Sequence, residues 1–328
     1  FTGELSSDYE GETYYFNTQK RKDINTKPMA DFHSFIKKTI ITSASNNNDN
    51  LLDVSCGRGG DLAHWLDSKL KMVVGIDINR DNLDNINNGI CNRVLESQMD
   101  NKSALLKNIL VIWGDTTRII NTGDAAKDDL NKYYLDVIYG NVDLVNVNNS
   151  KLKRFYGVGS NKFNVVSCQF SFHYFFENSI KLDIFLTNIS ENLKKGGKFV
   201  GRCLDGKRVF EALKTIPDLT VYENDKLLWK IIKKYSNVAM PDDSSSVGMP
   251  IDVYIESIGK TTQEWLVNFD YLATKALEYG LELKDVTSFE DHFTKLSKSK
   301  KKYGSMNQMS QNLKLYSFMN TSFVFEKQ

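Results

Sequence analysis

The sequence has few prolines, only four cysteines and no long apolar run. No segment approaches the roughly 20 consecutive apolar residues that a membrane-spanning helix needs, so no membrane segment is expected. Cys56, Cys91, Cys168 and Cys203 are too scattered for a Cys-x-x-Cys zinc site, and three of them lie inside apolar runs. We therefore expect buried, reduced thiols, which indicate a reducing, intracellular compartment.

An excess of charge of either sign is also absent, since 42 Lys and Arg stand against 41 Asp and Glu. With a net charge of +1, any contact with nucleic acid must come from local patches. The start, Phe-Thr-Gly-Glu-Leu, is polar and lacks an initiator Met, so we expect a chain excised from something longer, without a signal peptide. Asparagine is abundant at 46–50, 82–92 and 141–149, which indicates a bias of the source genome.

The most informative segment is residues 51–61, in which an apolar run ends in the glycine-rich turn Ser-Cys-Gly-Arg-Gly-Gly-Asp. A second apolar run, 72–77, ends in Asp77. This pattern predicts a β-loop-α-β unit whose turn admits a ligand and whose second strand offers a carboxylate to a ribose. The turn is not Gly-x-Gly-x-x-Gly, and Asp53 would repel phosphates but attract an ammonium group. The segment therefore favours S-adenosylmethionine over a dinucleotide; a tight turn that binds nothing is the alternative.

Strand-like runs alternate with helical patterns along most of the chain, which predicts an α/β fold with a mostly parallel sheet covered on both faces. The expected strands are 51–55, 71–77, 109–113, 163–168 and 197–203, and later 226–234, 251–257, 281–286 and 318–325. The expected helices are 29–41, which starts after Pro28, 180–193, which Gly196-Gly197 should end, and 264–279. A polar insertion at 118–162 and a break in the alternation at 214–260 complete a single domain.

Acidic residues close three strands, since Asp115 ends the third as Asp53 and Asp77 end the first two. Ligands of open α/β sheets bind at these carboxyl ends. Asp115 is placed to accept a hydrogen bond from an adenine amino group, and a helix cap is its alternative role.

The fourth strand is followed by an aromatic segment that holds Gln169, His173 and Tyr174. Aromatic rings beside hydrogen-bonding side chains are suited to holding a purine base. Some of the phenylalanines belong to the core in any reading, but His and Gln are hard to satisfy in a purely apolar core.

Two motifs together resemble the eukaryotic and viral mRNA cap guanine-N7 methyltransferases: Asp-Val-x-Cys-Gly-x-Gly-Gly-Asp-Leu at 53–62 and Ser-Cys-Gln-Phe-x-x-His-Tyr-x-Phe-Glu at 167–177. The opening helix at 31–41 and Glu-Trp-Leu-Val at 264–267 resemble further segments of this family, and the likeness runs from about residue 28 to the end. The resemblance implies a Rossmann-like, S-adenosylmethionine-dependent methyltransferase fold with a seven-stranded sheet. It divides the domain into an arm and helix (1–48), a cofactor-binding core (49–205), an insertion covering the cleft (206–262) and the rest of the sheet (263–328).

The resemblance also implies roles for individual residues. Lys37 would bind the methionine carboxylate of the cofactor, Asp77 its ribose and Asp115 its adenine. The glycine-rich turn and the end of the fourth strand complete the cofactor site, whose residues are Lys37, Asp53, Ser55, Gly57, Asp77, Asp115 and Gln169. Guanine would be held by His173, Tyr174 and Glu264, whose carboxylate suits the adjacent N1–H and 2-amino donors. His33 stands at a cap-contact position, with a surface histidine as the alternative, and Asn320 aligns where cellular members carry a Tyr. No metal and no general base are implied.

Some residues depart from the family pattern. Ser55 replaces a usual Gly, and Thr117 stands where a cap-stacking Tyr is frequent, so the stacking ring is left open among residues 170–176 and Tyr254. These departures fit the methyltransferase domain of a large DNA virus capping enzyme. The implied partners are the capped RNA 5′ end and triphosphatase and guanylyltransferase domains on the same polypeptide; the implied location is host cytoplasm or virion, or the nucleus for a cellular protein.

Basic residues are candidates for the cap triphosphate, with a solvated basic face as the alternative: Lys20, Arg21, Lys22, Arg58, Arg202, Lys207 and Arg208. Without the family resemblance, the residues alone leave three other functions possible. They are methylation of a small molecule or protein, nicotinamide-dependent oxidoreduction, and a non-catalytic subunit of a capping enzyme.

Overall fold

A computed structural model describes residues 24–299 and 303–328 of the chain, so Lys20, Arg21 and Lys22 lie outside the described residues. The elements of the first half are α1 (Lys27–Ala44), β1 (Asn50–Asp53), α2 (Leu62–Asp67), β2 (Met72–Asp77), α3 (Arg80–Asp84), α4 (Ile90–Asp100), β3 (Ile109–Trp113), α5 (Asp129–Tyr139) and β4 (Phe163–Gln169). Those of the second half are α6 (Ser179–Asn192), β5 (Leu193–Leu204), α7 (Gly206–Ala212), β6 (Asp218–Glu223), β7 (Lys226–Lys233), β8 (Pro250–Ile255), β9 (Thr261–Trp265), α8 (Phe269–Leu277), β10 (Leu281–Ser288), α9 (Phe289–Lys298), α10 (Gln311–Ser317) and β11 (Asn320–Lys327).

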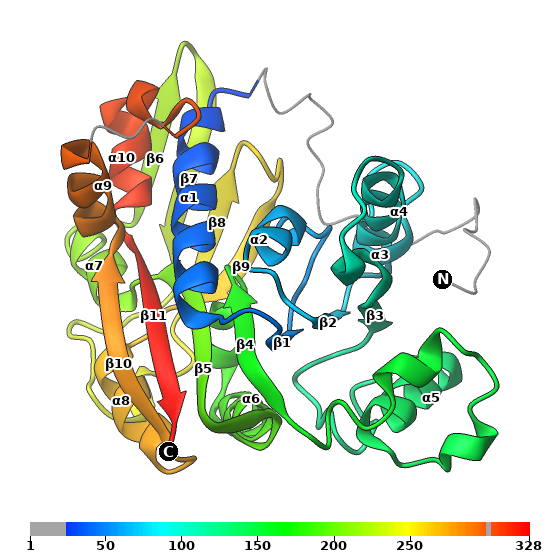
Figure 1. The fold of residues 1–328 in the computed structure, drawn as a ribbon. Helices are drawn as coiled ribbons and strands as arrows, with labels where there is room; N and C mark the ends of the chain where they lie inside the picture. The colour runs from blue at the N-terminus through cyan, green and yellow to red at the C-terminus, as the bar shows by residue number, and fades with distance from the viewer. Residues whose placement is uncertain (1–23, 300–302) are drawn as a thin grey trace.

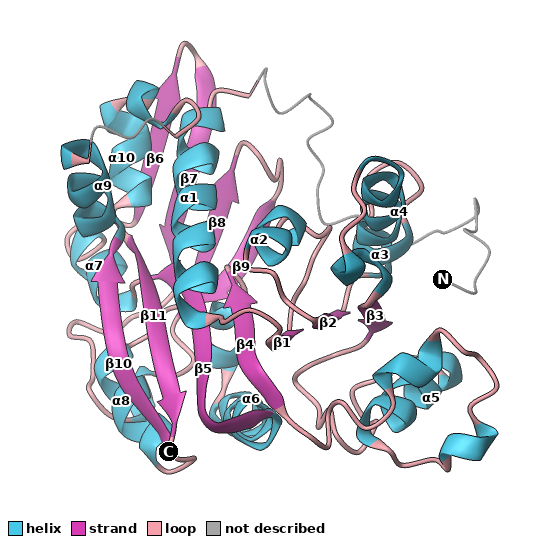
Figure 2. Ribbon diagram, viewed as in Figure 1, coloured by secondary structure: helices cyan, strands magenta, loops and turns pink. Residues whose placement is uncertain are grey.

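The main sheet has seven strands in the order β10-β11-β5-β4-β1-β2-β3. The pairings among β1 to β5 are parallel, and β11 runs antiparallel to both of its neighbours. Successive residues of β1 face opposite cores: Leu51 packs in the cluster of α1 and α4, and Leu52 in that of α6 and α8. Helices therefore cover both faces, as Figures 1 and 2 show, and the predicted α/β fold with a mostly parallel seven-stranded sheet is confirmed.

The opening helix forms where its sequence predicts, since Phe32, Ile36 and Ile40 are buried along one face and Pro28 stands in the first turn. The helix expected at 180–193 is present as α6, but the two glycines expected to end it do not. α6 stops at Asn192, and Gly196-Gly197 lie inside β5 instead. The pairing of β5 with β4 shifts between Leu193 and Lys198, so the two glycines form an irregularity in the strand, where Gly196 takes a φ of +73°.

A second, antiparallel sheet has the order β6-β7-β8-β9 and lies beyond the carboxyl ends of β4 and β5 in Figure 1. The helix expected from residue 264 was wrong at its start, because Glu264 lies on β9 and pairs with Ile251 of β8. The helix α8 begins only at Phe269, where the side chain of Asn268 accepts from the first free backbone N–H groups.

The chain leaves the main sheet after Asp205 and returns at Val267, and these two residues form an isolated parallel bridge. Gly206 donates its N–H to the Val267 carbonyl at 2.9 Å, and a Cβ on Gly206 would stand 2.5 Å from that oxygen. Only glycine permits so close an approach of the two backbones. The residues between them, which include the second sheet, are thus a closed excursion from the main fold.

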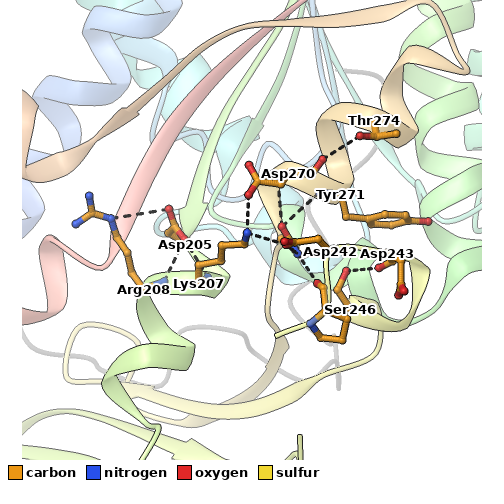
Figure 3. Close-up of polar contacts among 11 residues, drawn as sticks. Asp205, Lys207, Arg208, Asp242, Asp243, Ser246, Asp270, Tyr271 and Thr274 are labelled. Atoms are coloured by element: carbon orange, nitrogen blue, oxygen red, sulfur yellow. Dashed lines mark hydrogen bonds and ion pairs between the residues drawn. The ribbon is translucent and has the colours of Figure 1, made fainter. Parts of the chain in front are cut away.

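A cluster of polar side chains fastens this excursion, as Figure 3 shows. Lys207 Nζ lies 2.6 Å from Asp242 Oδ1 and 2.5 Å from Asp270 Oδ2. Asn268 Nδ2 donates to the Pro241 carbonyl at 2.6 Å. The loop between β7 and β8 is therefore tied to the first turns of α7 and α8.

Candidate active site

The carboxyl ends of the adjacent strands β4, β1 and β2 bring Gln169, Asp53 and Asp77 to one edge of the sheet. A cavity of about 340 Å³ lies at this edge. Its wall includes Lys37 of α1, Gln169 and the glycine-rich turn from Ser55 to Asp61. The predicted cofactor turn, the opening helix and the end of the fourth strand thus meet at one cavity.

The turn depends on glycine at two positions with left-handed backbone, Gly57 at φ +52° and Gly59 at φ +69°. A Cβ on Gly59 would stand 2.6 Å from the side chain of Ile90, so the close packing of α4 also requires glycine there. The Gly57 N–H donates to Asp77 Oδ2 at 2.7 Å, which ties the turn to the end of β2. These contacts fix the backbone of the turn.

Asp53 is fully buried and only partly satisfied. Its Oδ1 accepts from the Ser55 N–H at 3.1 Å, whereas its Oδ2 has no hydrogen-bond partner among the described residues. Burial, and then the nearby charge of Asp61, raise the pKa of Asp53 well above its usual value. An unsatisfied buried acceptor costs free energy that a ligand donor would recover.

Gln169 repeats this pattern on the neighbouring strand. Its Nε2 donates to Ser167 Oγ at 3.1 Å, and its Oε1 has no partner among the described residues. Lys37, on the same cavity wall, lies 2.7 Å from Asp61 Oδ1. Two free acceptors beside a lysine match the ammonium and carboxylate groups of a methionine moiety, so these residues fit S-adenosylmethionine.

The other two strand-end acids are engaged within the protein. Asp77 accepts from Gly57 N–H, Asn79 N–H and Asn82 Nδ2 at 2.7, 2.9 and 3.1 Å, although burial raises its pKa. Asp115 accepts from Thr117 and lies 3.2 Å from Lys127 Nζ; burial would raise its pKa, but these contacts outweigh it. Asp115 therefore makes its contacts in a turn, and a helix cap as its alternative role was wrong, because the next helix is α5 at Asp129–Tyr139. The ribose and adenine roles stay predictions.

A second group of side chains lies where β9 meets the short helix η5 (Phe172–Glu177) that follows β4. His173 Nδ1 lies 3.5 Å from Glu264 Oε2, and the rings of His173 and Tyr174 are 4.2 Å apart. Both His173 and Glu264 are buried, and neither nitrogen of His173 has a hydrogen-bond partner among the described residues. The structure thus brings together the three residues predicted to bind guanine.

Burial sets the charge of this pair. It lowers the pKa of His173 to about 3 and raises the pKa of Glu264 to about 8. A hydrogen bond from Thr262 to Glu264 opposes this rise only in part. At neutral pH the imidazole is therefore neutral and most of the carboxyl is protonated. The pair is a neutral, desolvated contact rather than an ion pair.

Tyr316 of α10 joins this group, and the sequence did not single it out. Burial, and then electrostatic interaction with Glu264 and Tyr174, raise the pKa of Tyr316, so its hydroxyl lies within electrostatic range of both groups. Asn320 does not supply a ring; it is buried and donates to the Tyr316 carbonyl at 2.9 Å. The sequence offered one signal for Tyr316: it stands four residues, about one helical turn, before Asn320, the position that aligns with the tyrosine of cellular members.

His33 and Arg202 are buried inside the protein and contact other residues of the chain. His33 Nε2 lies 2.9 Å from Ser317 Oγ, and the histidine is only 7% exposed, so the surface alternative was wrong. The Arg202 guanidinium lies 4.0 Å from the centre of the Phe170 ring and donates to the His33 carbonyl. Burial lowers the pKa of Arg202 to about 9.

The other cations proposed for the triphosphate are ion-paired within the protein. Arg58, which lines the cavity, lies 2.5 Å from Asp81; Lys207 contacts Asp242 and Asp270; and Arg208 lies 3.9 Å from Asp205. Within the described ranges, no group of three or more His, Cys, Asp and Glu could hold a metal ion. No helix in this part of the chain is long and apolar enough to cross a membrane.

Comparison with known proteins adds independent findings. A family model described as the mRNA (guanine-N(7))-methyltransferase domain matches residues 5–322. A protein of Acanthamoeba polyphaga mimivirus named "Probable mRNA-capping enzyme" is 29% identical over 292 residues, which cover 86% of this chain and 23% of that protein. The mRNA cap guanine-N(7) methyltransferase of Candida glabrata is 26% identical over 287 residues, 84% of this chain and 58% of that protein. The chain thus spans less than two thirds of the length of these relatives.

Among solved structures, the CcbJ methyltransferase of Streptomyces caelestis has a similar fold. The TM-score is 0.51 at 13% sequence identity, and the match covers 95% of this chain and 94% of that chain. At this identity the likeness concerns the fold alone.

Proposed function

The chain belongs to the mRNA (guanine-N7)-methyltransferase family, and on this premise we propose that it methylates N7 of the guanine in the 5′ GpppN cap of messenger RNA, with S-adenosylmethionine as the methyl donor. The observation that supports this most is the continuity of β4 and η5. Gln169 borders the cofactor cavity, and His173, four residues later on the same segment, contacts Glu264. The segment 169–173 therefore connects the cavity proposed for the methyl donor with the buried polar pair of His173 and Glu264.

S-adenosylmethionine, when bound, supplies a methyl group on a positively charged sulfonium. In our proposal, Asp53 Oδ2 and Gln169 Oε1 accept from its ammonium group, since both are buried acceptors without partners among the described residues. Lys37 binds its carboxylate, while Asp61, 2.7 Å away, keeps the ammonium of Lys37 at the cavity wall. Asp77 binds the ribose and Asp115 the adenine.

Guanine presents two adjacent donors, N1–H and the 2-amino group, and we propose that Glu264 accepts both as a carboxylate. Ionisation of Glu264 in a buried site is unfavourable alone, as its raised pKa shows. Two donors on the ligand reverse that balance, since hydrogen bonds to the charged form favour it. Methyl transfer then moves positive charge from the donor to the purine ring, next to this carboxylate, which stabilises the transition state.

His173 acts in this proposal by positioning. Guanine N7 carries a lone pair and no proton, so the reaction needs no base. With a pKa of about 3, His173 is neutral at physiological pH and can donate or accept a hydrogen bond. Tyr174 and Tyr316 border the same group and confine the plane of the base. The chemical step then depends on holding N7 in line with the methyl–sulfur bond.

We also propose that the domain acts inside the cell as part of a longer capping polypeptide. The mimivirus relative, a named capping enzyme, is matched over only 23% of its length. Triphosphatase and guanylyltransferase domains would supply the GpppN end that this domain consumes.

A methyl-transfer assay with labelled donor tests the proposal on GpppG, capped RNA and uncapped RNA of the same sequence. We expect label on guanine N7 of the first two only. Glu264→Gln should lose most of this activity, whereas Glu278→Gln, at an exposed position at the end of α8, should not. Equal labelling of uncapped RNA would overturn the proposed function, and full activity of Glu264→Gln would remove Glu264 from the guanine site.

A further inference from the structure

The edge of the main sheet opposite the cofactor cavity carries a row of cations. Parallel strands start at one edge and end at the other, so the segments that precede β2, β3, β4 and β5 lie together. Exposed basic residues lie in these segments and at the start of β5. Six of them, which we call the basal basic edge, are Lys69, Lys71, Lys107, Arg154, Lys162 and Lys195. In Figure 1 the starts of β4 and β5 lie at the lower side of the molecule, near the C-terminus.

Contacts join neighbouring parts of the row. Arg154 donates to the Lys107 carbonyl at 3.4 Å, and Asn108 donates to the Lys71 carbonyl at 3.1 Å. At the other end, the charge of Lys162 acts with burial to lower the pKa of Lys327. Neighbouring strands lie about 4.8 Å apart, so the row extends over roughly 15–20 Å.

These cations lack the partners that cations elsewhere have. None of the six forms an ion pair with a described carboxylate. At the opposite edge, by contrast, Lys37, Arg58 and Lys207 are each paired with aspartate. The whole chain has a net charge of only +1, so positive charge is concentrated in this row. Its cations repel one another and lower the stability of the folded protein unless an anion is bound.

We propose that the basal basic edge binds the phosphates of single-stranded RNA downstream of the cap, an inference that rests on the proposed function. The chemistry favours RNA over an acidic peptide because the row is linear and includes a partly exposed tyrosine, Tyr156, two residues after Arg154. Cations along a track beside aromatic rings are characteristic of single-strand binding surfaces. The substrate already brings such a strand to the protein.

The distance between the two edges decides which substrates can use both. β4 spans seven residues, so its ends are roughly 20 Å apart, and RNA passing over the surface has a longer path. A cap dinucleotide cannot reach the basal basic edge while its guanine is in the site. The edge should therefore affect capped RNA of about 25 nucleotides and leave GpppG unaffected.

The test compares two triple variants. Lys71→Ala/Lys107→Ala/Lys162→Ala removes half of the row, and the control Lys214→Ala/Lys234→Ala/Lys284→Ala removes three lysines that are each paired with an acid. Fluorescence anisotropy measures binding of a labelled, uncapped single strand of about 25 nucleotides over a salt series. Loss of three phosphate contacts should reduce the salt slope by about 2 and weaken binding by at least tenfold at low salt.

Kinetics give the second readout. The basal variant should raise the KM for long capped RNA at least tenfold and keep the KM for GpppG, while the control variant should keep both. Wild-type binding and salt slope in the basal variant would overturn the inference, as would an equal rise of both KM values. If polyglutamate binding is lost in the basal variant while RNA binding is unchanged, the edge serves an acidic protein segment and the RNA inference is wrong. Failure of the proposed function would appear separately, as an absence of methyl transfer to GpppG by the wild type.

Discussion

The pH dependence of guanine binding tests the role of Glu264 most sharply. Burial raises the pKa of this carboxyl to about 8. About a tenth of it is therefore ionised at pH 7 and half at pH 8, so the step from pH 8 to pH 7 costs about 1 kcal/mol of the binding free energy, and each further unit costs about 1.4 kcal/mol. If the carboxylate accepts from N1–H and the 2-amino group, the affinity for GpppG should rise about fivefold from pH 7 to pH 8.

Isothermal titration calorimetry across about pH 6 to 8.5 measures this rise for the wild type, for Glu264→Gln and for the control Glu278→Gln. The amide that replaces the carboxyl in Glu264→Gln has no proton to lose, so this variant should bind weakly with a flat profile, and the control should follow the wild type. A flat wild-type profile would refute the reasoning, because the buried carboxyl would then not change charge on binding.

The raised pKa of Glu264 also determines how the stability of the folded protein depends on pH. The pKa of Glu264 in the folded protein lies above its usual value of 4.5. Its contribution to stability is therefore complete below about pH 4.5 and is lost as the pH rises through 8. Thermal unfolding should show Glu264→Gln gaining stability relative to the wild type over that interval, and a constant difference would contradict the buried carboxyl.

Three further predictions concern other parts of the structure. Asp77→Ala should weaken S-adenosylmethionine binding by about 2–4 kcal/mol and lower the melting temperature, because three donors lose their acceptor; calorimetry showing unchanged affinity in a folded variant would remove Asp77 from the ribose site. His173→Gln should keep part of the single-turnover rate, with no titration step near pH 6.5 in the wild type, since the pKa of His173 is about 3; a wild-type step that vanishes in the variant would establish a general base. Lys207→Ala should barely change the melting temperature, because its ion pairs are exposed, but should speed amide exchange in the loop at 241–246; unchanged exchange would show that these pairs do not fasten the loop.

The features that the sequence predicted correctly are those encoded by short, local patterns. The buried strands and the glycine-rich turn are of this kind, because a continuous apolar run and a left-handed glycine have few alternative structures. The opening helix was predicted for the same reason, since its apolar residues recur at helical spacing.

What the sequence missed depends on contacts between distant segments. Glu264 lies on a strand because Ile251 pairs with it, although the residues that follow have helical periodicity. β6 was not expected, since most of its residues are only half-buried and show no clear alternation. Tyr316 approaches Glu264 only through the packing of α10 on the second sheet. The charge states of His173 and Glu264 likewise follow from burial, which no local pattern specifies.

The bridge between Asp205 and Val267 has a consequence for the order in which the molecule acquires its two sites while folding. The cavity residues before Asp205 belong to α1 and the parallel strands, and their pairing does not require the excursion. Glu264, by contrast, stands three residues before the return point, so it reaches His173 only when that long loop has closed, which is an entropically late event. A nascent or partly unfolded chain should therefore gain the capacity to hold the methyl donor before it can select a guanine. Pulsed hydrogen exchange during refolding would see β1, β2 and β4 protected ahead of β9.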